Sequence, residues 1–464
     1  IGKNIVGVVL QCNNYEVIDL GVMVPCEKIL DEAKKQNVDI IGLSGLITPS
    51  LDEMIHIAKE MTRLDFNIPL LIGGATTSPA HTSVKIAPEY DNGVIYVKDA
   101  SKSVNVVQRL LSNASDAYKK EITEEHSHRR ELHNQKRKKQ EFLPYAKAKK
   151  NRYEIDWQKA SLYKPNKLGI TTFNDIKIEE LIPYIDWMPF FNAWEFHGKF
   201  PEILTDDRFG EEATKLYEDA QNMLQTLSSQ GLGNCKGVIG LYPANAIKED
   251  VAIYADDHRK NEVTRLNFVR QQRLKTNSNP YLSLADFIAP VGLGSDYMGF
   301  FAVTAGEEIY TLAKSYERNN DDYNSILIKA LADRFVEAAA EWLHQEVRTE
   351  AWGYTKESLL TLEEIRLETY QGIRPAPGYP ACPDHSEKTK IWEILDVNNA
   401  IGASLTESFA MMPASTISGY YFSHPETKYF SVNQIDLDQL EDYAIRKNIS
   451  INVAKKLLGP IISF

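Results

Sequence analysis

Residues 39–46 of the chain read DIIGLSGL, a short apolar run that ends in Ser44-Gly45-Leu46. Residues 69–74, PLLIGG, have the same plan and end in Gly73-Gly74, and residues 94–97, VIYV, form a third apolar run. A helical pattern of apolar residues at 51–63 separates the first two runs, and another at residues 102–111 follows the third. Apolar strands that alternate with helices predict an open parallel sheet with helices on both faces.

The segment before residue 39 extends this alternation. Residues 4–11 fit a helix, residues 15–20 (YEVIDL) fit a strand, and residues 26–36 fit a helix. The sheet would then have four strands, fewer than a doubly wound sheet usually has. Because the chain opens inside a helix and begins with Ile1, we expect a first strand in an upstream part of a longer protein. Residues 1–114 are therefore predicted to be a doubly wound, flavodoxin-like or Rossmann-like α/β domain without its first strand.

Residues 115–156 have a different character and are predicted to be a basic interdomain linker. Between Lys119 and Arg152 the sequence has 12 Lys or Arg and five Glu. This composition favours a solvated helix followed by an irregular connector at residues 143–152. Three histidines occur here but do not share one helical face, so solvated side chains are favoured over a metal site: His126, His128 and His133.

Residues 157–464 follow another pattern, in which strands are not regularly followed by helices. Helical patterns occur at residues 179–185, 211–228, 322–348 and 437–447. Short β-like runs occur at residues 237–242, 252–255 and 300–304. This irregular order predicts an α+β region, distinct in class from the first domain.

Composition excludes several classes of protein. A chain of 464 residues is long enough for two to four domains, and its net charge of −12 argues against a nucleic-acid binder. Four cysteines without a C-x-x-C pair favour a reducing compartment, and we expect the cytoplasm. The apolar runs are too short to span a membrane, and no signal peptide or nucleotide-binding glycine motif is found.

The ends of the predicted strands carry small and hydroxyl residues. In an open α/β sheet, ligands bind outside the carboxyl ends of the strands, where small residues leave space and hydroxyls offer hydrogen bonds. The residues in question are Ser44, Leu46, Thr48, Ser50, Gly73 and Gly74. The alternative is local: Gly73-Gly74 would be a strand-to-helix turn, and Thr48 and Ser50 would cap the next helix.

Taken together, the spacing of these residues resembles a known signature. Gly2, 41 residues, Ser44-x-Leu46, 26 residues and Gly73-Gly74 resemble D-x-H-x-x-G–S-x-L–G-G, which marks the B12-dependent methyltransferases and mutases. The resemblance implies cobalamin contacts at Gly2, Ser44, Leu46, Thr48, Gly73, Gly74 and Ala100. The Asp and the cobalt-ligating His of the signature would precede Ile1, so this chain has no metal ligand of its own. Ser50 matches the Ser that tunes that His.

The second region contains a proline-rich loop, residues 371–380 (QGIRPAPGYP). Three prolines exclude a helix or a central strand, so the loop is expected to be ordered but irregular. An Arg fixed in such a loop, Arg374, suits bidentate binding of a carboxylate. The alternative is a rigid turn in which Arg374 pairs with a neighbouring Glu at the surface.

This loop resembles the S-adenosylmethionine (AdoMet) site in the activation domain of the cobalamin-dependent methionine synthase family, and the resemblance extends over most of residues 157–464. It implies AdoMet contacts at Asp186, Glu337, Arg374, Gly378, Tyr379, Tyr429 and Phe430. At position 430 a second Tyr is common, so stacking is expected there in place of a hydroxyl contact. Asp333 and Glu341 flank Glu337 at helical spacing, which leaves a solvated acidic face as the alternative for these three residues.

The resemblance implies a function. Members of this family make methionine from homocysteine and methyltetrahydrofolate through methylcobalamin, and AdoMet with a flavodoxin-like electron donor restores cofactor that has oxidised to cob(II)alamin. The homocysteine and folate modules would lie upstream in the same chain. Two alternatives stay open: a corrinoid carrier or B12 sensor without methyl transfer, and a flavodoxin-like interaction domain joined to an unrelated scaffold.

Overall fold

The computed structural model describes residues 2–137, 141–356 and 360–462. The chain divides into two compact units, unit 1 at Ile1–Gln140 and unit 2 at Glu141–Phe464. This division falls inside the predicted linker at residues 115–156. Among the helices of the described ranges, none has the length and apolar character that a membrane crossing needs.

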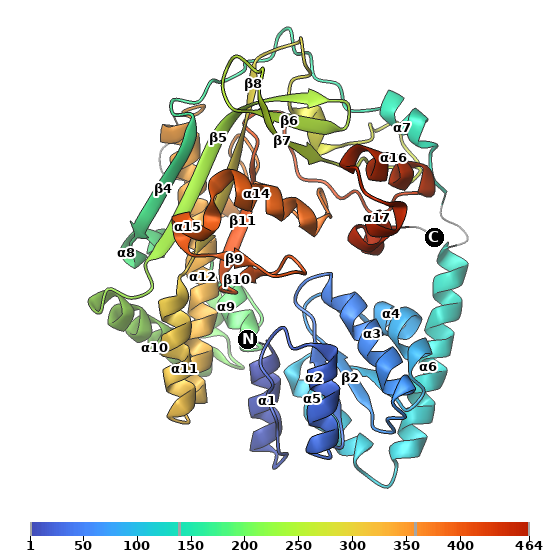
Figure 1. Ribbon diagram of the computed structural model, residues 1–464. Coiled ribbons are helices and arrows are strands. Elements are labelled where there is room, and N and C mark those ends of the chain that lie inside the picture. Colours follow the sequence, from blue (N-terminus) through green and yellow to red (C-terminus); the bar gives the residue numbers. More distant parts are fainter. Residues whose placement is uncertain (1, 138–140, 357–359, 463–464) are drawn as a thin grey trace. The chain divides into compact units, whose positions relative to one another are not determined.

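Unit 1 is built on a parallel sheet with strand order β1-β2-β3 (Figure 1). The strands are β1 (Ile41–Ser44), β2 (Leu70–Gly73) and β3 (Val94–Tyr96). The long helices around them are α1 (Gly2–Cys12), α2 (Cys26–Lys35), α3 (Ser50–Arg63) and α5 (Ala100–Leu110). Short turns join β2 to β3: α4 (Pro79–His81), η1 (Thr82–Ile86) and η2 (Ala87–Glu89). Parallel strands alternating with helices confirm the predicted α/β class.

Helices cover both faces of this sheet, as the apolar strands predicted. On one face, Leu30 of α2 and Met61 of α3 pack with Ile72 in one buried cluster. On the other face, Val107 of α5 packs with Ile95, and Leu10 of α1 lies against them. Strands that are buried on both faces need apolar residues at every position, which explains why PLLI and VIY show no alternation.

The prediction of a strand at residues 15–20 is wrong. This segment is irregular and pairs with no strand of the described chain, so the described sheet has three strands and not four. Tyr15 is only half-buried, against the cluster that contains Leu71 and Ile95. β-branched residues raise the propensity for a strand, but a strand forms only where its backbone groups find a neighbouring strand to pair with.

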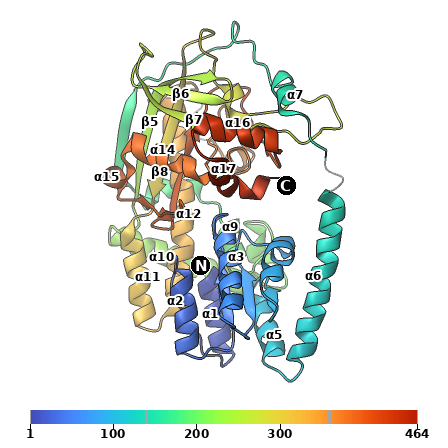
Figure 2. The same ribbon diagram turned by 45° about the vertical axis from the view of Figure 1, so that its right-hand side comes forward.

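Helix α6 (Ser115–Arg137) runs along the side of unit 1 (Figure 2). The sequence placed it in a solvated linker, but His126 on this helix is 8% exposed. Its Nε2 donates to the Val94 carbonyl at 2.7 Å, and its Nδ1 accepts from the Ser83 hydroxyl at 2.7 Å. The expectation of solvated histidines is therefore wrong for His126, although His128 and His133 are exposed as predicted. No group of three or more metal-ligating side chains occurs among the described residues.

The irregular connector predicted at residues 143–152 is also wrong. This segment contains helix α7 (Tyr145–Lys150), which packs on unit 2. Tyr145 is 3% exposed, and its backbone N–H donates to Oδ2 of Asp438 at 2.7 Å. The Leu143 N–H donates to the Gln272 carbonyl at 3.0 Å. The basic segment is thus anchored to unit 2. One buried aromatic side chain and two backbone hydrogen bonds hold it there, although its lysines are solvated.

Unit 2 contains an antiparallel sheet with strand order β11-β8-β5-β6-β7, in which β4 also pairs with β5. Its strands are β4 (Gly169–Ile176), β5 (Cys235–Ile247), β6 (Asp250–Tyr254), β7 (Glu262–Asn267), β8 (Asp296–Thr304) and β11 (Thr416–Tyr421). A separate two-stranded ribbon is formed by β9 (Ser404–Leu405) and β10 (Met411–Met412). The β-like runs that the sequence predicted lie in β5, β6 and β8.

The two faces of this sheet carry different helices. Tyr420 packs in a cluster with Ile391 of α14 (Lys388–Leu395). The next residue, Tyr421, points the other way and stacks on His344 of α12 (Asp322–Glu346), with ring centroids 5.1 Å apart. This alternation follows from the two-residue period of a strand. It puts the face of α12 and the end of β11 in contact, where the proline-rich loop also lies.

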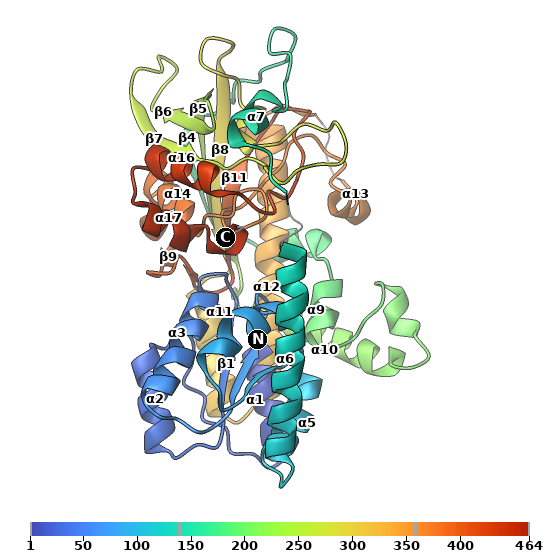
Figure 3. The same ribbon diagram turned by 90° about the vertical axis from the view of Figure 1, so that its right-hand side faces the viewer.

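The remaining helical segments surround this core, and α10 projects from one side of unit 2 (Figure 3). They are α8 (Ile178–Leu181), η3 (Ile182–Tyr184), α9 (Met188–Ala193), η4 (Glu202–Thr205), α10 (Gly210–Ser229), η5 (Leu284–Phe287), α11 (Glu307–Arg318), η6 (Val347–Ala351), α13 (Leu362–Arg366), η7 (His385–Glu387), α15 (Val397–Ile401), α16 (Leu437–Lys447), α17 (Ile451–Leu457) and η8 (Gly459–Ile461). All four predicted helical stretches are helical, and the α+β class is confirmed.

Candidate cofactor sites

The structure brings the ends of β1 and β2 together in unit 1. Ser44 is the last residue of β1 and lies opposite Gly73, the last residue of β2. The Gly45 N–H donates to the Gly73 carbonyl at 2.9 Å, so the pairing continues one step beyond the strands. The strand order therefore places the Ser-x-Leu and Gly-Gly motifs side by side, although 26 residues separate them in sequence.

The backbone conformation at position 74 requires a glycine. Its φ is +104°, and a Cβ at this position would lie 2.3 Å from the Gly45 carbonyl oxygen. The turns after β1 and β2 are thus in backbone contact, and no side chain fits between them. Gly73 is less constrained, because its Cβ would lie 3.2 Å from the Val97 carbonyl oxygen. Gly74 is therefore needed for the turn, as the alternative interpretation expected. The turn does not by itself require a glycine at position 73.

The surface at these strand ends is uncovered. Ser44 and Gly74 are exposed, and Leu46 is 69% exposed. Ser50 does not take the cap position of α3: it is the first residue of the helix, and Pro49 precedes it at the cap. The Ser50 hydroxyl instead donates to the Ile47 carbonyl. Of the other predicted contacts, Gly2 is exposed at the start of α1, and Ala100 is 9% exposed at the start of α5.

In unit 2, the proline-rich loop runs beside β11. Ile373 and Phe422 exchange two backbone bonds of 3.0 Å, and the Tyr420 N–H donates to the Pro375 carbonyl at 2.9 Å. Gly372 has a φ of +91°, and a Cβ there would lie 2.6 Å from the Tyr354 hydroxyl. The loop is ordered but irregular, as predicted, because its prolines remove donors and β11 fixes the remaining groups.

Arg374 lies between the two residues that bond to β11. Its backbone N–H donates to the Tyr429 hydroxyl at 3.0 Å, and its Nη2 forms an ion pair with Glu341 of α12. Burial is the largest single effect and opposes the charge on the guanidinium, but Glu341 together with Tyr370, Tyr429 and Glu337 outweighs it, so the pKa of Arg374 is raised. The Nε of Arg374 is buried and has no hydrogen-bond partner among the described residues. One donor is therefore committed to Glu341, and a second, Nε, has no partner among the described residues.

Three carboxylates stand in a row on α12 beside this loop. Asp333 accepts from the Ser415 hydroxyl at 2.5 Å, and Glu341 binds Arg374. Both are half-buried, so the solvated acidic face is wrong for these two residues. Glu337, between them, is exposed, yet the surrounding protein raises the pKa of its carboxyl against the opposing effect of Arg374. A carboxylate with this environment gains from a cationic partner.

The other residues predicted to contact AdoMet differ in their exposure to solvent. Tyr379 is 65% exposed and Tyr429 is 40% exposed, so both rings can meet a ligand. Asp186 is exposed, and its Oδ1 accepts from the Met188 N–H at 3.0 Å. Phe430 packs inward, with its ring centroid 6.4 Å from that of Phe287, and this contact does not favour the stacking role expected from its position.

The partner of Arg374 was not identified from the sequence. Glu341 was named only as a neighbour of Glu337, and nothing in the sequence indicated which of the three carboxylates would reach the loop 33 residues later. The helical period does place Glu337 and Glu341 on one face of α12. An acidic helix face, opposite in charge to Arg374, was therefore the signal available in the sequence.

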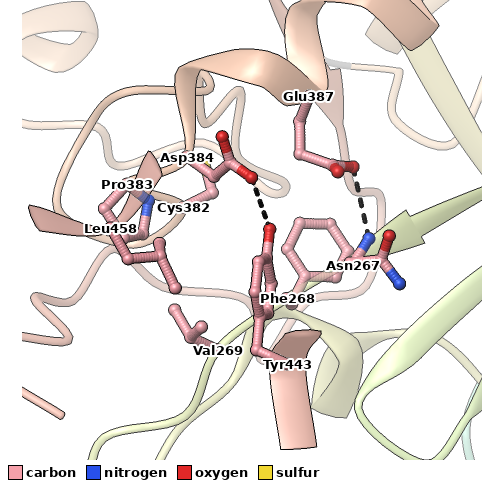
Figure 4. Close-up of a pocket in the computed structure, with 9 residues that line it drawn as sticks. All are labelled: Asn267, Phe268, Val269, Cys382, Pro383, Asp384, Glu387, Tyr443 and Leu458. Carbon is pink, nitrogen blue, oxygen red and sulfur yellow. Dashed lines mark hydrogen bonds between the residues drawn. The ribbon is translucent and has the colours of Figure 1, made fainter. Parts of the chain in front are cut away.

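A cavity of about 10 Å³ lies just beyond the loop and is lined in part by Cys382, Asp384 and Glu387 (Figure 4). The Tyr443 hydroxyl donates to Asp384 at 2.5 Å, and the Asn267 N–H donates to Glu387 at 3.2 Å across its wall. This volume holds one water molecule at most. It cannot accept a nucleoside, so we place no ligand in it.

Comparisons with known proteins identify the kind of domain in each unit. A family model described as "Vitamin B12 dependent methionine synthase, activation domain" matches residues 177–448, and one described as "B12 binding domain" matches residues 1–103. The crystal structure of the MetH reactivation domain bound to AdoHcy is 47% identical, with a TM-score of 0.68, and the match covers 70% of this chain and 99% of that chain.

A second solved structure is the methanol:cobalamin methyltransferase complex MtaBC from Methanosarcina barkeri. It is 23% identical, with a TM-score of 0.24 over 27% of this chain and 45% of that chain, and it adds nothing to the argument on the fold. The activation-domain model alone spans more than half of the 464 residues. The chain therefore belongs to the vitamin B12-dependent methionine synthase family, and it contains a B12-binding domain followed by the activation domain.

Proposed function

We propose that unit 1 carries cobalamin at the ends of β1 and β2 and that unit 2 binds AdoMet on the Arg374 loop. Together they would remethylate oxidised cobalamin at the expense of AdoMet and one electron. When bound, cobalamin supplies a cobalt centre that accepts and gives a methyl group, and AdoMet supplies the methyl group. The residues of this chain hold, orient and shield the two groups.

The strand ends of unit 1 fit a large planar cofactor with a tail. Ser44 offers a hydroxyl at the mouth of the sheet, and Gly73 adds no side chain beside it. Leu46, exposed at 69%, presents an apolar surface that a ligand would cover. The same three positions match the cobalamin signature, and the B12-binding family model covers them.

The observation that carries the AdoMet proposal is the partly unpaired guanidinium of Arg374. Its buried Nε lacks a partner among the described residues, and the neighbouring Glu337 lies open beside it. AdoMet carries a carboxylate, an ammonium and a sulfonium, so one cation and one anion at a fixed separation match it. The relative whose crystal structure contains AdoHcy supports the same assignment.

A corrinoid carrier or B12 sensor without methyl transfer is the alternative. Such a protein needs the strand ends of unit 1 but has no use for an ordered Arg374 loop. The second unit accounts for most of the chain and matches the activation domain, which favours the methyltransferase role.

For the whole protein, we propose synthesis of methionine from homocysteine and methyltetrahydrofolate, with these two substrates bound by other modules of the same chain. A flavodoxin-like protein is proposed as the electron donor. The four cysteines are free in the structure, which agrees with a reducing compartment such as the cytoplasm.

Titration calorimetry of the chain with AdoMet tests the proposal directly. We expect saturable binding that Arg374→Ala weakens by more than about tenfold, since a desolvated carboxylate then loses its partner. Asn245→Ala serves as the control, because Asn245 lies on β5 and its side chain bonds to the Ala289 and Gly294 carbonyls, outside both α12 and the Arg374 loop. Equal binding by the parent and the Arg374 variant would exclude the assigned site.

A further inference from the structure

The turn that carries Gly378 rests on a histidine outside the predicted site. Gly378 has a φ of +96°, and a Cβ at this position would lie 2.1 Å from Cε1 of His385. The imidazole therefore occupies the space that any larger residue at 378 would need. His385 is itself 8% exposed, so its ring is held by the protein on its other sides.

The turn sets the direction of Tyr379. The Gly378 N–H donates to the Cys382 carbonyl at 2.8 Å, and the Tyr379 N–H donates to the Ala376 carbonyl at 3.2 Å. The Tyr379 ring, in contrast, is 65% exposed and gains little from packing. Because packing does little to hold the Tyr379 side chain, the backbone conformation at Gly378 sets the direction of the ring.

Lys388 fixes the imidazole in turn. Its ammonium donates to Nδ1 of His385 at 2.9 Å and to the Phe409 carbonyl at 3.1 Å, and the lysine is 4% exposed. With Nδ1 accepting, the ring proton is assigned to Nε2. Burial, aided by Lys388, lowers the pKa of His385 to about 4, so the ring is neutral at physiological pH. A neutral acceptor held by one ammonium has a single preferred orientation.

We propose that His385 is a positioning residue of the AdoMet site: held by Lys388, it supports Gly378 and thereby presents Tyr379 to the ligand. The inference rests on the proposed binding of AdoMet at this loop. Neither His385 nor Lys388 need touch the ligand. Their contribution is preorganisation, which lowers the ordering cost that an exposed tyrosine would otherwise add to binding.

The test compares three replacements of His385 by AdoMet calorimetry and thermal unfolding. His385→Ala removes both the support and the acceptor, and we expect affinity to fall about tenfold. His385→Leu restores bulk without an acceptor for Lys388, and should stay weak. His385→Gln keeps an acceptor and most of the volume, and should recover affinity to within about threefold of the parent. If His385 had a purely structural role, the Leu and Gln variants would instead bind AdoMet with the same affinity.

A double-mutant cycle with Gly378→Ala gives a second measurement. Alone, this change forces Cβ against the imidazole and should abolish binding. In the His385→Ala background the imidazole no longer occupies the space and only the backbone strain at a φ of +96° remains, so adding Gly378→Ala should cost clearly less affinity than it costs the parent. Equal losses in the two backgrounds would show that the two residues are not coupled, and would overturn the inference.

The outcomes separate this inference from the function on which it rests. Loss of binding in Arg374→Ala with unchanged binding in His385→Ala and Lys388→Met would leave AdoMet binding intact and refute the positioning role. Absence of AdoMet binding by the parent protein would refute both. If His385→Ala fails to fold, Lys388→Met and His385→Gln carry the test, because each changes the contact with less loss of volume.

Discussion

Nη2 of Arg374 forms an ion pair with Oε1 of Glu341, and each of the two side chains is only 17% exposed. The pair joins a loop beside β11 to the face of helix α12. A surface ion pair contributes at most about 1 kcal/mol, but a pair withdrawn this far from water leaves a costly charge behind when one partner is removed. Arg374 therefore braces the loop through Glu341, while its Nε has no partner among the described residues and is the donor that we propose for a ligand.

Arg374→Ala should consequently affect folding as well as binding. We expect the free energy of unfolding of unit 2 to fall by about 1–3 kcal/mol, since Glu341 loses its counter-charge. AdoMet affinity should fall by about 2–5 kcal/mol. Urea denaturation and calorimetry measure the two effects separately.

The double variant Arg374→Ala with Glu341→Gln separates the brace from the ligand contact. Replacing the carboxylate removes the stranded charge, so most of the lost stability should return. AdoMet binding should not return, because the donor for its carboxylate is still absent. Recovery of both properties together would mean that Arg374 acts only through folding.

Glu337→Gln should move stability and binding in opposite directions. The surrounding protein withdraws solvent from the Glu337 carboxyl and raises its pKa, so the charged form is disfavoured in the folded protein, and the neutral amide should raise the stability of unit 2 near neutral pH. AdoMet binding by the parent should weaken as the pH falls through this raised pKa, because the anion is then lost. We expect the Gln variant to bind weakly with no such pH dependence, as calorimetry between pH 4.5 and pH 7.5 would report.

Gly74 and Gly73 should respond differently to substitution. Gly74→Ala places Cβ against the Gly45 backbone at a positive φ, and should destabilise unit 1 by about 2 kcal/mol or more whether or not cobalamin is present. Gly73→Ala should fold normally. Gly73→Leu should block methylcobalamin binding in a chain that also carries the upstream part of the signature, measured by absorbance titration. Unimpaired binding by the leucine variant would remove Gly73 from the cofactor channel.

His126 should make the docking of α6 sensitive to acid. Burial lowers the pKa of His126 below its usual value near 6.5, so the histidine binds a proton more readily in the unfolded chain. Its stabilising effect is complete above pH 6.5 and is lost as the pH falls from there through the lowered value. Tryptic cleavage of α6 should therefore accelerate between pH 7 and pH 5. A variant with His126→Gln should show cleavage that changes little over this range.

Helix α7 should resist proteases although it is rich in lysine. Tyr145 is buried and its backbone is bonded to Asp438, so Lys147, Lys149 and Lys150 are held on unit 2. Limited trypsinolysis should spare these sites in the parent chain and cut them in Tyr145→Ala. Preferred cleavage at residues 143–152 of the parent would instead favour the irregular connector that the sequence predicted.

Much of the fold was predictable because it depends on local patterns. The runs at β2 and β3 are almost entirely apolar, as a strand buried on both faces requires, and the run at β1 begins with apolar residues before it ends in Ser44. The long helix α12 was likewise predictable from its helical pattern, and β5 was predictable in part from the β-like run at residues 237–242. The strand expected at residues 15–20 failed because pairing is a property of two segments, and the described chain supplies no second segment there.

The sequence by itself determined which residue types stand at the two sites: Ser44 and the two glycines at strand ends, and Arg374 in a loop that its prolines keep irregular. Only the tertiary structure decided what those residues contact. It joined Arg374 to Glu341, aimed His385 at Gly378, and buried His126 in a segment whose composition indicated solvent. Composition and period report the preferences of single residues and short segments. Partners distant in the chain are chosen when helices and strands pack, because burial then leaves each polar group only the neighbours that the fold provides.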